Sequence, residues 1–178
     1  MNIFNEGNSQ TINQVLAAKD QRVALQQAIF KKYPADTLVD VNLNIPGPIK
    51  NNQYLEKLFQ TGIKQLENEW QELGYPYKLV SALDQDTGSE NFYILALPIK
   101  KVKLSTVEFE NQTQLGRLFD ADVLVKDQAR AISRKDLRRK ARQCFLCSRP
   151  AKECARSRRH SVSEMQEYIS NLYTKYVK

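Results

Sequence analysis

The chain has 178 residues, 42% of them hydrophobic and 26% charged, with a formal net charge of +7 at pH 7. That composition is ordinary for a soluble globular protein, and the length suits one domain with a hydrophobic core. No segment approaches the roughly 18 apolar residues of a membrane-spanning helix, and residues 1–10 lack the pattern of a signal peptide, so we expect no membrane partner. Three cysteines make a poor disulfide framework, and we expect a cytoplasmic protein.

Residues 11–50 predict a helix, a strand and a stiff loop. Thr11 and Gln14 have capping-box spacing for a helix over 11–30. The apolar residues that lie mainly on one side of this helix are Ile12, Val15, Leu16, Val23 and Ile29. Residues 37–45 alternate apolar and polar side chains, which indicates a half-buried strand with a polar second face. The strand runs into Pro46-Gly47-Pro48, where two prolines around a glycine predict a defined turn.

Residues 52–73 form the clearest predicted helix, with Gly74 as its C-cap. Its apolar stripe consists of Leu55, Leu58, Phe59, Ile63, Leu66, Trp70 and Leu73. Residues 77–83 and 92–99 then predict two strands joined by a turn-rich segment. The second strand is almost wholly apolar, which favours a central place in the sheet.

The second half of the chain gives weaker signals. Residues 100–110 fit a helix or a strand, and periodicity does not decide between them. Residues 115–125 predict a strand, and residues 133–143 predict a basic helix with few apolar positions. A last helix is expected to begin near Ser163, with Gln166 at capping-box distance.

These elements predict a single α+β (mixed α/β) domain over 1–178, with helices packed on a mixed sheet. We expect a sheet-and-helix core at 11–125, a basic segment rich in cysteine and arginine at 126–160, and a C-terminal helix at 161–178. The basic segment holds thirteen Lys and Arg against three Asp and Glu, a local charge of +10, so the rest of the chain carries −3. Such a segment attracts polyanions; the alternative is a solvated basic surface without a specific ligand.

Two carboxylates, Asp120 and Asp122, stand at i and i+2 in an apolar run that follows Gly116-Arg117. On a strand, both side chains point to the same face. Two neighbouring carboxylates suit a hard cation such as Mg²⁺, a glycine lets a phosphate approach the backbone, and an arginine can bind phosphate oxygens in a bidentate way. The pattern indicates metal-assisted transfer of a phosphate-bearing group. The alternative is a solvated pair on an exposed strand.

The three cysteines and the one histidine lie close together in the sequence, as C-x2-C-x6-C-x5-H from Cys144 through Cys147 and Cys154 to His160. Three thiolates and an imidazole are ligands of tetrahedral Zn²⁺, although the middle spacing is shorter than in common zinc fingers. The alternative is three reduced thiols and a histidine that binds a phosphate or caps a helix. Arginines between these positions suit phosphate oxygens.

Three segments together resemble one enzyme family: Asn44–Lys50, Gly116–Val123, and the stretch from Arg142 to His160 with its cysteines. In this order they are similar to segments of the holo-acyl-carrier-protein synthase of citrate lyase, also called apo-citrate lyase phosphoribosyl-dephospho-CoA transferase. The resemblance covers about residues 11–175.

The resemblance implies a nucleotidyltransferase whose donor is triphosphoribosyl-dephospho-CoA. The acceptor would be a serine of the acyl-carrier (γ) subunit of citrate lyase, and pyrophosphate would be released. The glycine-led turn before Asp120 and Asp122 also resembles a divergent polymerase-β-like nucleotidyltransferase site, in which such a turn holds the triphosphate and the aspartates bind two metals. The chain departs from that wider pattern because Arg117 stands where a serine follows the glycine.

One or two Mg²⁺ ions held by Asp120 and Asp122 would neutralise the donor and activate the serine hydroxyl. A third carboxylate is commonly needed; we expect Glu108 to supply it, with Glu110, Asp84 and Asp40 as alternatives. The predicted catalytic residues are therefore Asp120, Asp122, Arg117 and Glu108. The predicted substrate-binding residues are Gly116, Asn44, Gly47, Lys50, Arg134, Arg142, Arg156 and Arg158. The candidate zinc ligands are Cys144, Cys147, Cys154 and His160.

The basic segment would dock an acidic carrier subunit as well as the donor. The rival hypothesis is a basic, non-enzymatic nucleic-acid-binding module. Phe145 is the only aromatic residue between 126 and 160, whereas stacking on single-stranded bases needs more. That reading also leaves Asp120 and Asp122 unexplained, so we expect no nucleic-acid partner. A carrier subunit of another decarboxylase or lyase stays open as the acceptor.

Overall fold

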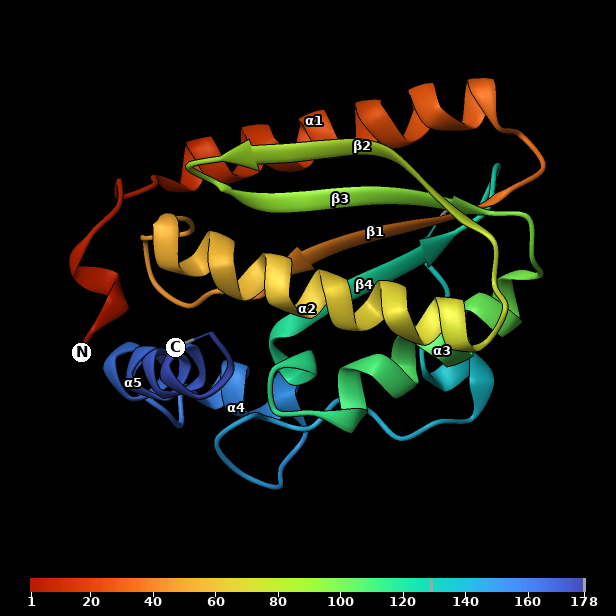
Figure 1. Ribbon diagram of the computed structural model, residues 1–178. Helices are drawn as coiled ribbons and strands as arrows, with labels where there is room; N and C mark the ends of the chain where they lie inside the picture. The colour runs from red at the N-terminus through yellow and green to blue at the C-terminus, as the bar shows by residue number, and fades with distance from the viewer. Residues whose placement is uncertain (129, 178) are drawn as a thin grey trace.

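The computed structural model describes residues 1–128 and 130–177, and within them four strands form one sheet in the order β2-β3-β1-β4 (Figure 1). The strands are β1 (Thr37–Leu43), β2 (Tyr77–Gln85), β3 (Gly88–Leu95) and β4 (Phe119–Leu124). The helices are α1 (Ile12–Lys32), α2 (Gln53–Glu72), α3 (Ile99–Gln112), α4 (Ala151–Ser157) and α5 (Val162–Tyr176). This single α+β domain confirms the predicted fold class.

Every pair of neighbouring strands in the described sheet is antiparallel, so the expectation of a mixed sheet is wrong. β2 and β3 form a hairpin, and β1 pairs with β3 on one side and β4 on the other. The apolar pattern of a strand identifies its buried face but not its direction. The helix between β1 and β2 is typical of a parallel crossover, yet β2 adds outside β3 and not beside β1.

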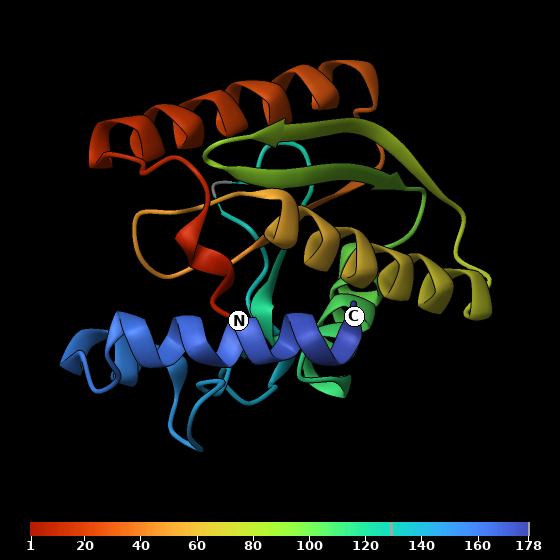
Figure 2. The same ribbon diagram turned by 60° about the vertical axis from the view of Figure 1, so that its left-hand side comes forward.

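Helices cover both faces of the sheet. α1 lies along one face, and α2 and α3 lie on the other, where α5 packs beside α2 (Figures 1 and 2). The N-terminal turn (Ile3–Asn5) packs on α5, where the Ile3 amide donates to Ser170 Oγ at 3.2 Å. The last helix therefore ties the start of the chain to the body of the domain.

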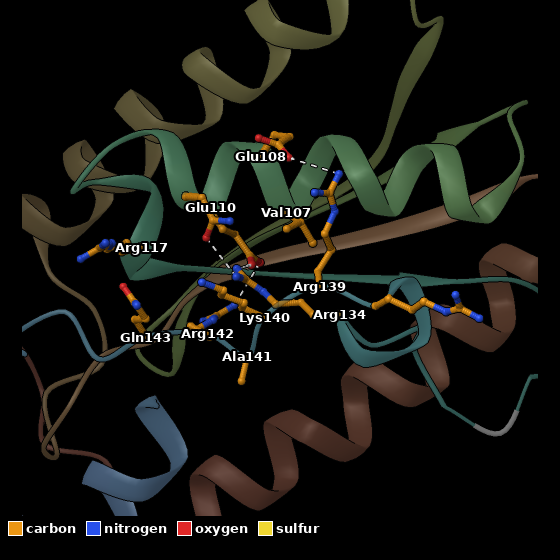
Figure 3. A pocket seen from close by; sticks show the side chains of 12 residues that line it. Val107, Glu108, Glu110, Arg117, Arg134, Arg139, Lys140, Ala141, Arg142 and Gln143 are labelled. Atoms are coloured by element: carbon orange, nitrogen blue, oxygen red, sulfur yellow. Dashed lines mark hydrogen bonds and ion pairs between the residues drawn. The ribbon is translucent and has the colours of Figure 1, made fainter. Parts of the chain in front are cut away.

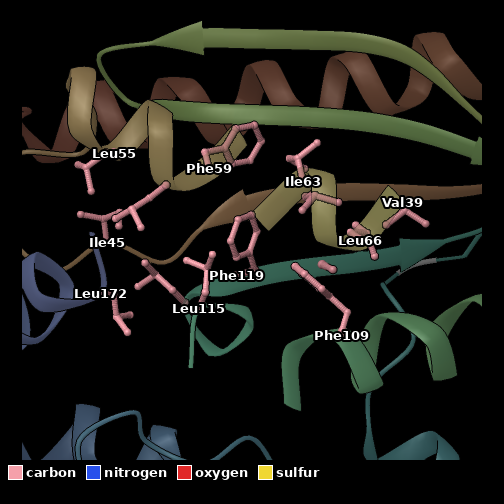
Figure 4. Close-up of a cluster of buried hydrophobic side chains, with 14 of the residues drawn as sticks. Val39, Ile45, Leu55, Phe59, Ile63, Leu66, Phe109, Leu115, Phe119 and Leu172 are labelled. Carbon is pink, nitrogen blue, oxygen red and sulfur yellow. The ribbon is translucent and has the colours of Figure 1, made fainter. Parts of the chain in front are cut away.

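The main core fills the space between the sheet and α2, α3 and α5 (Figure 4). Phe119 of β4 is central to it, because its ring stacks on Phe59 at 5.8 Å and meets Phe109 edge-on at 5.3 Å. Gly62 of α2 makes room for that ring, since a Cβ there would lie 2.2 Å from it. A smaller cluster under α1 consists of Ile29, Leu38, Phe92 and Ile94.

Helix α1 begins with the predicted capping box, because Thr11 Oγ1 accepts from the Gln14 amide and the Gln14 side chain accepts from the Thr11 amide. Its burial differs from the apolar pattern. Ile12, Leu16 and Val23 are 79%, 50% and 50% exposed, whereas Ile29 is buried. The side of α1 that faces the sheet carries Ile29 together with the polar residues Arg22 and Gln26, and these two contact the site described below.

Three local expectations change in the second half of the chain. The ambiguous residues 100–110 are helical, within α3. The basic helix expected over 133–143 is absent: the structure has only a single 3-10 turn at Lys135–Leu137, because the segment offers few apolar side chains to bury. α5 begins earlier than expected, with Ser161 and Glu164 as the capping box. Among the described helices, none combines the length and the apolar character needed to cross a membrane.

Candidate functional site

Asp120 and Asp122 lie on the same face of β4, as their spacing predicts. The alternate residues Phe119, Ala121 and Val123 are buried in the main core, so the two carboxylates point to the opposite face, which α1 covers. The antiparallel register places Asp122 beside Asp40 of β1 and Asp120 beside Asn42. Side chains paired in this way have Cβ atoms about 5 Å apart. The sheet therefore gathers three aspartates on one face.

Asp40 is fully buried. Gln26 Nε2 of α1 donates to its Oδ2 at 2.8 Å, and Arg22 Nε lies 3.6 Å from the same oxygen while also pairing with Glu90 of β3. The other oxygen, Oδ1, has no hydrogen-bond partner among the described residues. Burial raises the pKa of Asp40 well above its ordinary value, and Arg22 opposes this only in part. A buried carboxylate oxygen without a hydrogen-bond partner, beside two further carboxylates, is of a type that can coordinate a hard cation.

The surroundings of Asp122 also disfavour its ionised form. Burial, and then the charge of Asp120, raises its pKa to about 6, against opposing contributions from Lys103 and Arg22. Asp120 is the outermost of the three aspartates, with its side chain 46% exposed, and Arg142 Nη2 lies 3.2 Å from its Oδ1. Carboxylates that stay close together despite this repulsion fit a hard divalent cation.

Glu108 does not join these aspartates. It lies on α3, which packs on the other face of the sheet; its side chain is 54% exposed, and Arg139 Nη2 approaches it at 3.9 Å. Asp84 is engaged at the far end of β2, where its Oδ1 accepts from Asn51 and Ser89. The sheet register therefore places Asp40, the last of the sequence alternatives, next to the pair.

Glu110 of α3 is buried and binds both the edge strand β4 and two arginines. Its Oε1 accepts from the Ala121 amide at 3.0 Å and lies 3.0 Å from Arg142 Nη2, while Oε2 pairs with Arg134. Lys103 Nζ donates to the Ala121 carbonyl at 3.1 Å. Arg142 thus spans from Glu110 on one side of β4 to Asp120 on the other.

A cationic cavity of about 470 Å³ opens beside this edge (Figure 3). We call it the arginine cavity. It is lined by Val107, Glu108, Glu110, Asn111, Arg117, Arg134, Arg138, Arg139, Lys140, Ala141, Arg142 and Gln143. Six cations against two carboxylates suit a ligand with several phosphate charges, since arginine forks match phosphate oxygens. Of the predicted site residues, Arg117, Arg134 and Arg142 line it.

Gly116 has a packing reason to be glycine. A Cβ at this position would lie 2.1 Å from the Phe109 carbonyl oxygen, and the Gly116 amide already donates to Thr113 Oγ1 at 2.9 Å. The Arg117 amide donates to the Thr113 carbonyl at 3.3 Å. This turn therefore aims Arg117 and the start of β4, but the Gly116 amide is not free for a phosphate.

A second cavity, of about 530 Å³, shares Arg117, Arg142 and Gln143 with the arginine cavity. Its other lining residues are Asn44, Pro46, Cys144, Phe145, Ala151, Cys154, Ala155, Arg158, His160, Ser161, Val162 and Met165. Apolar side chains contribute much of this lining, in contrast to the arginine cavity. Of the predicted substrate-binding residues, Asn44, Arg142 and Arg158 line it.

The remaining predicted substrate-binding residues lie outside both cavity linings. Gly47 has a φ of +84° in the loop that packs on α5, and Lys50 Nζ donates to the Ile45 carbonyl at 2.7 Å, so both shape the loop. Arg156 of α4 is exposed. These contacts support a structural role for the Pro46-Gly47-Pro48 turn.

The cysteine–histidine cluster is assembled. The ligand atoms of Cys144, Cys147, Cys154 and His160 all lie within 4.8 Å of one another and form a group that could hold a metal ion. Cys147 Sγ lies 3.4 Å from Cys154 Sγ and 3.4 Å from His160 Nε2. The hydrogen bond to His160 is the main reason that the pKa of the Cys147 thiol falls to about 6.

Sequence reasoning ranked Asp40 last and missed its partners Arg22, Gln26 and Glu90. The available signal was the polar second face of the strand at 37–45, which places Asp40 where a sheet face can carry a site. Arg22 and Gln26 lie four residues apart on α1, on the same side as Val15 and Ile29, but as polar residues they are not part of the apolar pattern.

Comparisons with known proteins agree with one another. Residues 10–176 match the family described as apo-citrate lyase phosphoribosyl-dephospho-CoA transferase. A probable apo-citrate lyase phosphoribosyl-dephospho-CoA transferase from Streptococcus pyogenes serotype M5 (strain Manfredo) is 40% identical over 168 residues, which is 93% of this chain and 86% of that protein. An apo-citrate lyase phosphoribosyl-dephospho-CoA transferase from Citrobacter koseri is 34% identical over 155 residues, which is 87% of this chain and 84% of that protein.

Protein CitXG of Leuconostoc mesenteroides subsp. cremoris is 32% identical over all 178 residues of this chain, which correspond to 38% of that longer protein. The family and most of these relatives are named as transferases. The matched range, residues 10–176, spans the positions of the three aspartates and of the cysteine–histidine cluster. The chain belongs to the apo-citrate lyase phosphoribosyl-dephospho-CoA transferase family.

Proposed function

We propose that this transferase moves the phosphoribosyl-dephospho-CoA group from its triphosphate precursor to a serine of the acyl-carrier subunit of apo-citrate lyase. The observation that carries the proposal is the row of Asp40, Asp122 and Asp120, joined through Arg142 to a cavity rich in arginine. The aspartates supply ligands for a cation, and the arginine cavity supplies positive charge for a polyphosphate. The family assignment names the transferred group.

The cation that we propose for the three aspartates is Mg²⁺, because it prefers carboxylate oxygens and phosphate oxygens together. Bound there, it would polarise the α-phosphoryl group and stabilise the departing pyrophosphate. We infer that Asp40 is the third ligand in place of Glu108, since Asp40 Oδ1 is buried and lacks a hydrogen-bond partner among the described residues.

The residues of the chain account for the rest of the reaction. The serine oxygen forms a bond to the α-phosphorus, the bond from that phosphorus to the bridging oxygen of pyrophosphate breaks, and the serine proton passes to water. Arg117, Arg142 and Arg139 line the space where that pyrophosphate gains charge, and fixed cations there stabilise the transition state. Arg142 also holds Asp120 in place through its ion pair.

The turn and strand arrangement supports a divergent polymerase-β-like nucleotidyltransferase site. The Gly116-Arg117 turn leads directly into β4, and the neighbouring strand β1 adds the third aspartate. Unlike the site that the sequence suggested, this one uses the turn to position Arg117, since the Gly116 amide bonds to Thr113.

The cysteine–histidine cluster favours a different metal ion from the aspartates. Thiolates and imidazole are ligands for zinc and not for magnesium, so its metal would be separate from the ion that serves transfer. The three free thiols also fit a reducing compartment, and we expect the reaction to occur in the cytoplasm.

The structure argues against the nucleic-acid alternative, because the one aromatic residue of the basic segment is not available to stack on bases. Phe145 stacks on Tyr168 of α5, with ring centroids 5.3 Å apart, and so is already used within the protein. The exposed cations of the basic segment instead suit an acidic carrier subunit, because opposite charge speeds the encounter of two proteins.

Intact-mass spectrometry of the apo acyl-carrier subunit tests the proposal directly. We expect incubation with this chain, the triphosphoribosyl-dephospho-CoA donor and Mg²⁺ to add the mass of the donor less pyrophosphate, and chelation to prevent the gain. Asp120→Asn should abolish it, while Glu108→Gln should retain it. An unchanged carrier mass with folded enzyme and authentic donor would point to another carrier protein as acceptor, which the same assay can then examine.

A further inference from the structure

The cysteine–histidine cluster lies outside the carboxylate site but at the wall of the second cavity. Cys144, Cys154 and His160 all line that cavity. The four ligands come from three places in the chain: the loop at 144–147, helix α4, and the turn before α5. We propose that the cluster binds one structural Zn²⁺ ion, which holds the wall of the second cavity and the position of Arg142.

The distances fit a tetrahedral thiolate site. With a Zn–S bond of about 2.3 Å, two sulfur ligands lie about 3.8 Å apart and a sulfur and a nitrogen slightly closer. The Cys147 Sγ to Cys154 Sγ and Cys147 Sγ to His160 Nε2 distances are both 3.4 Å, and every ligand pair lies within 4.8 Å. A disulfide would need a sulfur–sulfur distance of about 2.05 Å, which these thiols do not have.

The loop that carries the first two cysteines is already folded as a metal-binding knuckle. Its base is closed by the Cys144 amide donating to the Arg149 carbonyl and the Ala151 amide donating to the Arg142 carbonyl, both at 2.8 Å. Inside the loop, the Leu146 amide points at Cys144 Sγ at 3.4 Å. Amide donors around thiolate sulfurs orient the ligands and stabilise their negative charge.

The segment needs such a cross-link because it has almost no hydrophobic core. Between residues 130 and 161, all of which the structure describes, only the Cys144 and Cys154 side chains are buried. A short segment without buried apolar side chains is commonly held by a metal or a disulfide. Here the two buried side chains are themselves ligands.

The four ligands complete a tetrahedron, which makes the site structural. Its effect on the carboxylate site passes through Arg142, which stands two residues before Cys144 and pairs with Asp120 and Glu110. Holding the knuckle therefore holds the cation that spans the edge of β4. This part of the inference rests on the proposed function, whereas binding of zinc does not.

Metal content tests the site without donor or carrier. The full-length chain is purified without chelators from cells grown with zinc, and its zinc is measured by mass spectrometry. We expect one zinc per chain and less than about a tenth of that in Cys147→Ser and His160→Ala. Ser148→Ala, an exposed neighbour in the same loop, should keep its zinc, and His160→Cys should regain it because a fourth thiolate can replace the imidazole.

Because a ligand variant can fail to fold, the unaltered chain supplies a second measurement. Its reduced, metal-free form should take up one Co²⁺ with the visible absorption of a tetrahedral thiolate complex. Zinc-free protein that also shows no such absorption would overturn the site. Removal of zinc, followed by restoration of Mg²⁺, should increase amide exchange in residues 142–162 by about tenfold or more and leave β1–β4 protected. Equal exchange before and after removal would refute the structural role.

Discussion

Asp40 of β1 and Asp122 of β4 occupy paired positions in the antiparallel sheet, and burial raises the pKa of both carboxyls. A pair that is buried and of like charge destabilises the fold unless a cation or a proton neutralises it. The arrangement that would bind Mg²⁺ therefore also lowers the stability of the fold when no cation is bound.

Asp40→Asn should remove transfer while Glu108→Gln leaves it nearly unchanged. Loss of a direct ligand should lower the rate by more than about 100-fold, since even the loss of an outer partner of a metal ligand costs 10–100-fold. The mass gain of the carrier subunit over time measures both variants. A fully active Asp40→Asn enzyme would remove Asp40 from the cation site, and an inactive Glu108→Gln enzyme would restore the original assignment.

Asp122→Asn should stabilise the metal-free protein at pH 8. The folded pKa of Asp122 is about 6 and its ordinary value is 3.8, so the folded state binds the proton more tightly. The stabilisation from this group is present below pH 4 and is lost as the pH rises through 6, by on the order of 3 kcal/mol. Urea unfolding from pH 4 to 8 should therefore show a flatter profile for the variant.

Added Mg²⁺ supplies the control for that prediction. It should raise the unfolding midpoint of the unaltered chain at pH 8, because a ligand that binds only the folded state stabilises it. The same addition should shift Asp122→Asn much less. An identical Mg²⁺ response in the two proteins would contradict a role for Asp122 in cation binding.

Arg142→Ala should lower both stability and transfer, because Arg142 pairs with buried Glu110 and with Asp120. Removing one partner of a buried ion pair costs about 3–5 kcal/mol, and Arg134, which also pairs with Glu110, should reduce that figure here. Thermal unfolding and carrier mass gain measure the two effects. Arg156→Ala is the matched control for stability: Arg156 is exposed and lies in neither cavity lining, so the unfolding temperature should stay near that of the unaltered chain.

Gly116→Ala should reduce stability through packing. An added Cβ would lie 2.1 Å from the Phe109 carbonyl oxygen, and the backbone must shift to relieve that contact. Overpacking of this kind costs about 1–3 kcal/mol. Thermal unfolding should show the loss, whereas the KM for the donor should stay the same once the folded fraction is taken into account. A raised KM with unchanged stability would instead support a direct contact between Gly116 and the donor.

The sequence predicted those features that depend on local patterns. The alternation around Asp120 and Asp122 indicated their shared face, the capping box placed the start of α1, and the short spacing from Cys144 to His160 brought the four ligands together. Each of these relationships spans few residues, and periodicity or loop length determines it. The fold class followed from the same patterns.

The features that the sequence did not predict depend on long-range pairing. Asp40 and Asp122 are 82 positions apart in the sequence, and only the strand order shows that they are neighbours. The preference for Glu108 relied on closeness in the sequence, yet α3 carries that residue to the opposite face of the sheet. The burial of α1 was misjudged in part because Arg22 and Gln26, which are half-buried, contact carboxylates and so do not appear in an apolar pattern.

The strand that bears Asp120 and Asp122 is the outer strand of the sheet, and such a strand normally invites another chain to pair with it. In this protein the outward amide and carbonyl of Ala121 are occupied by Glu110 and Lys103, and the Val123 carbonyl accepts from the Ile132 amide. A foreign strand would find these three backbone groups already paired. The middle of this edge is therefore blocked to strand addition, which disfavours self-association of the protein into extended sheets.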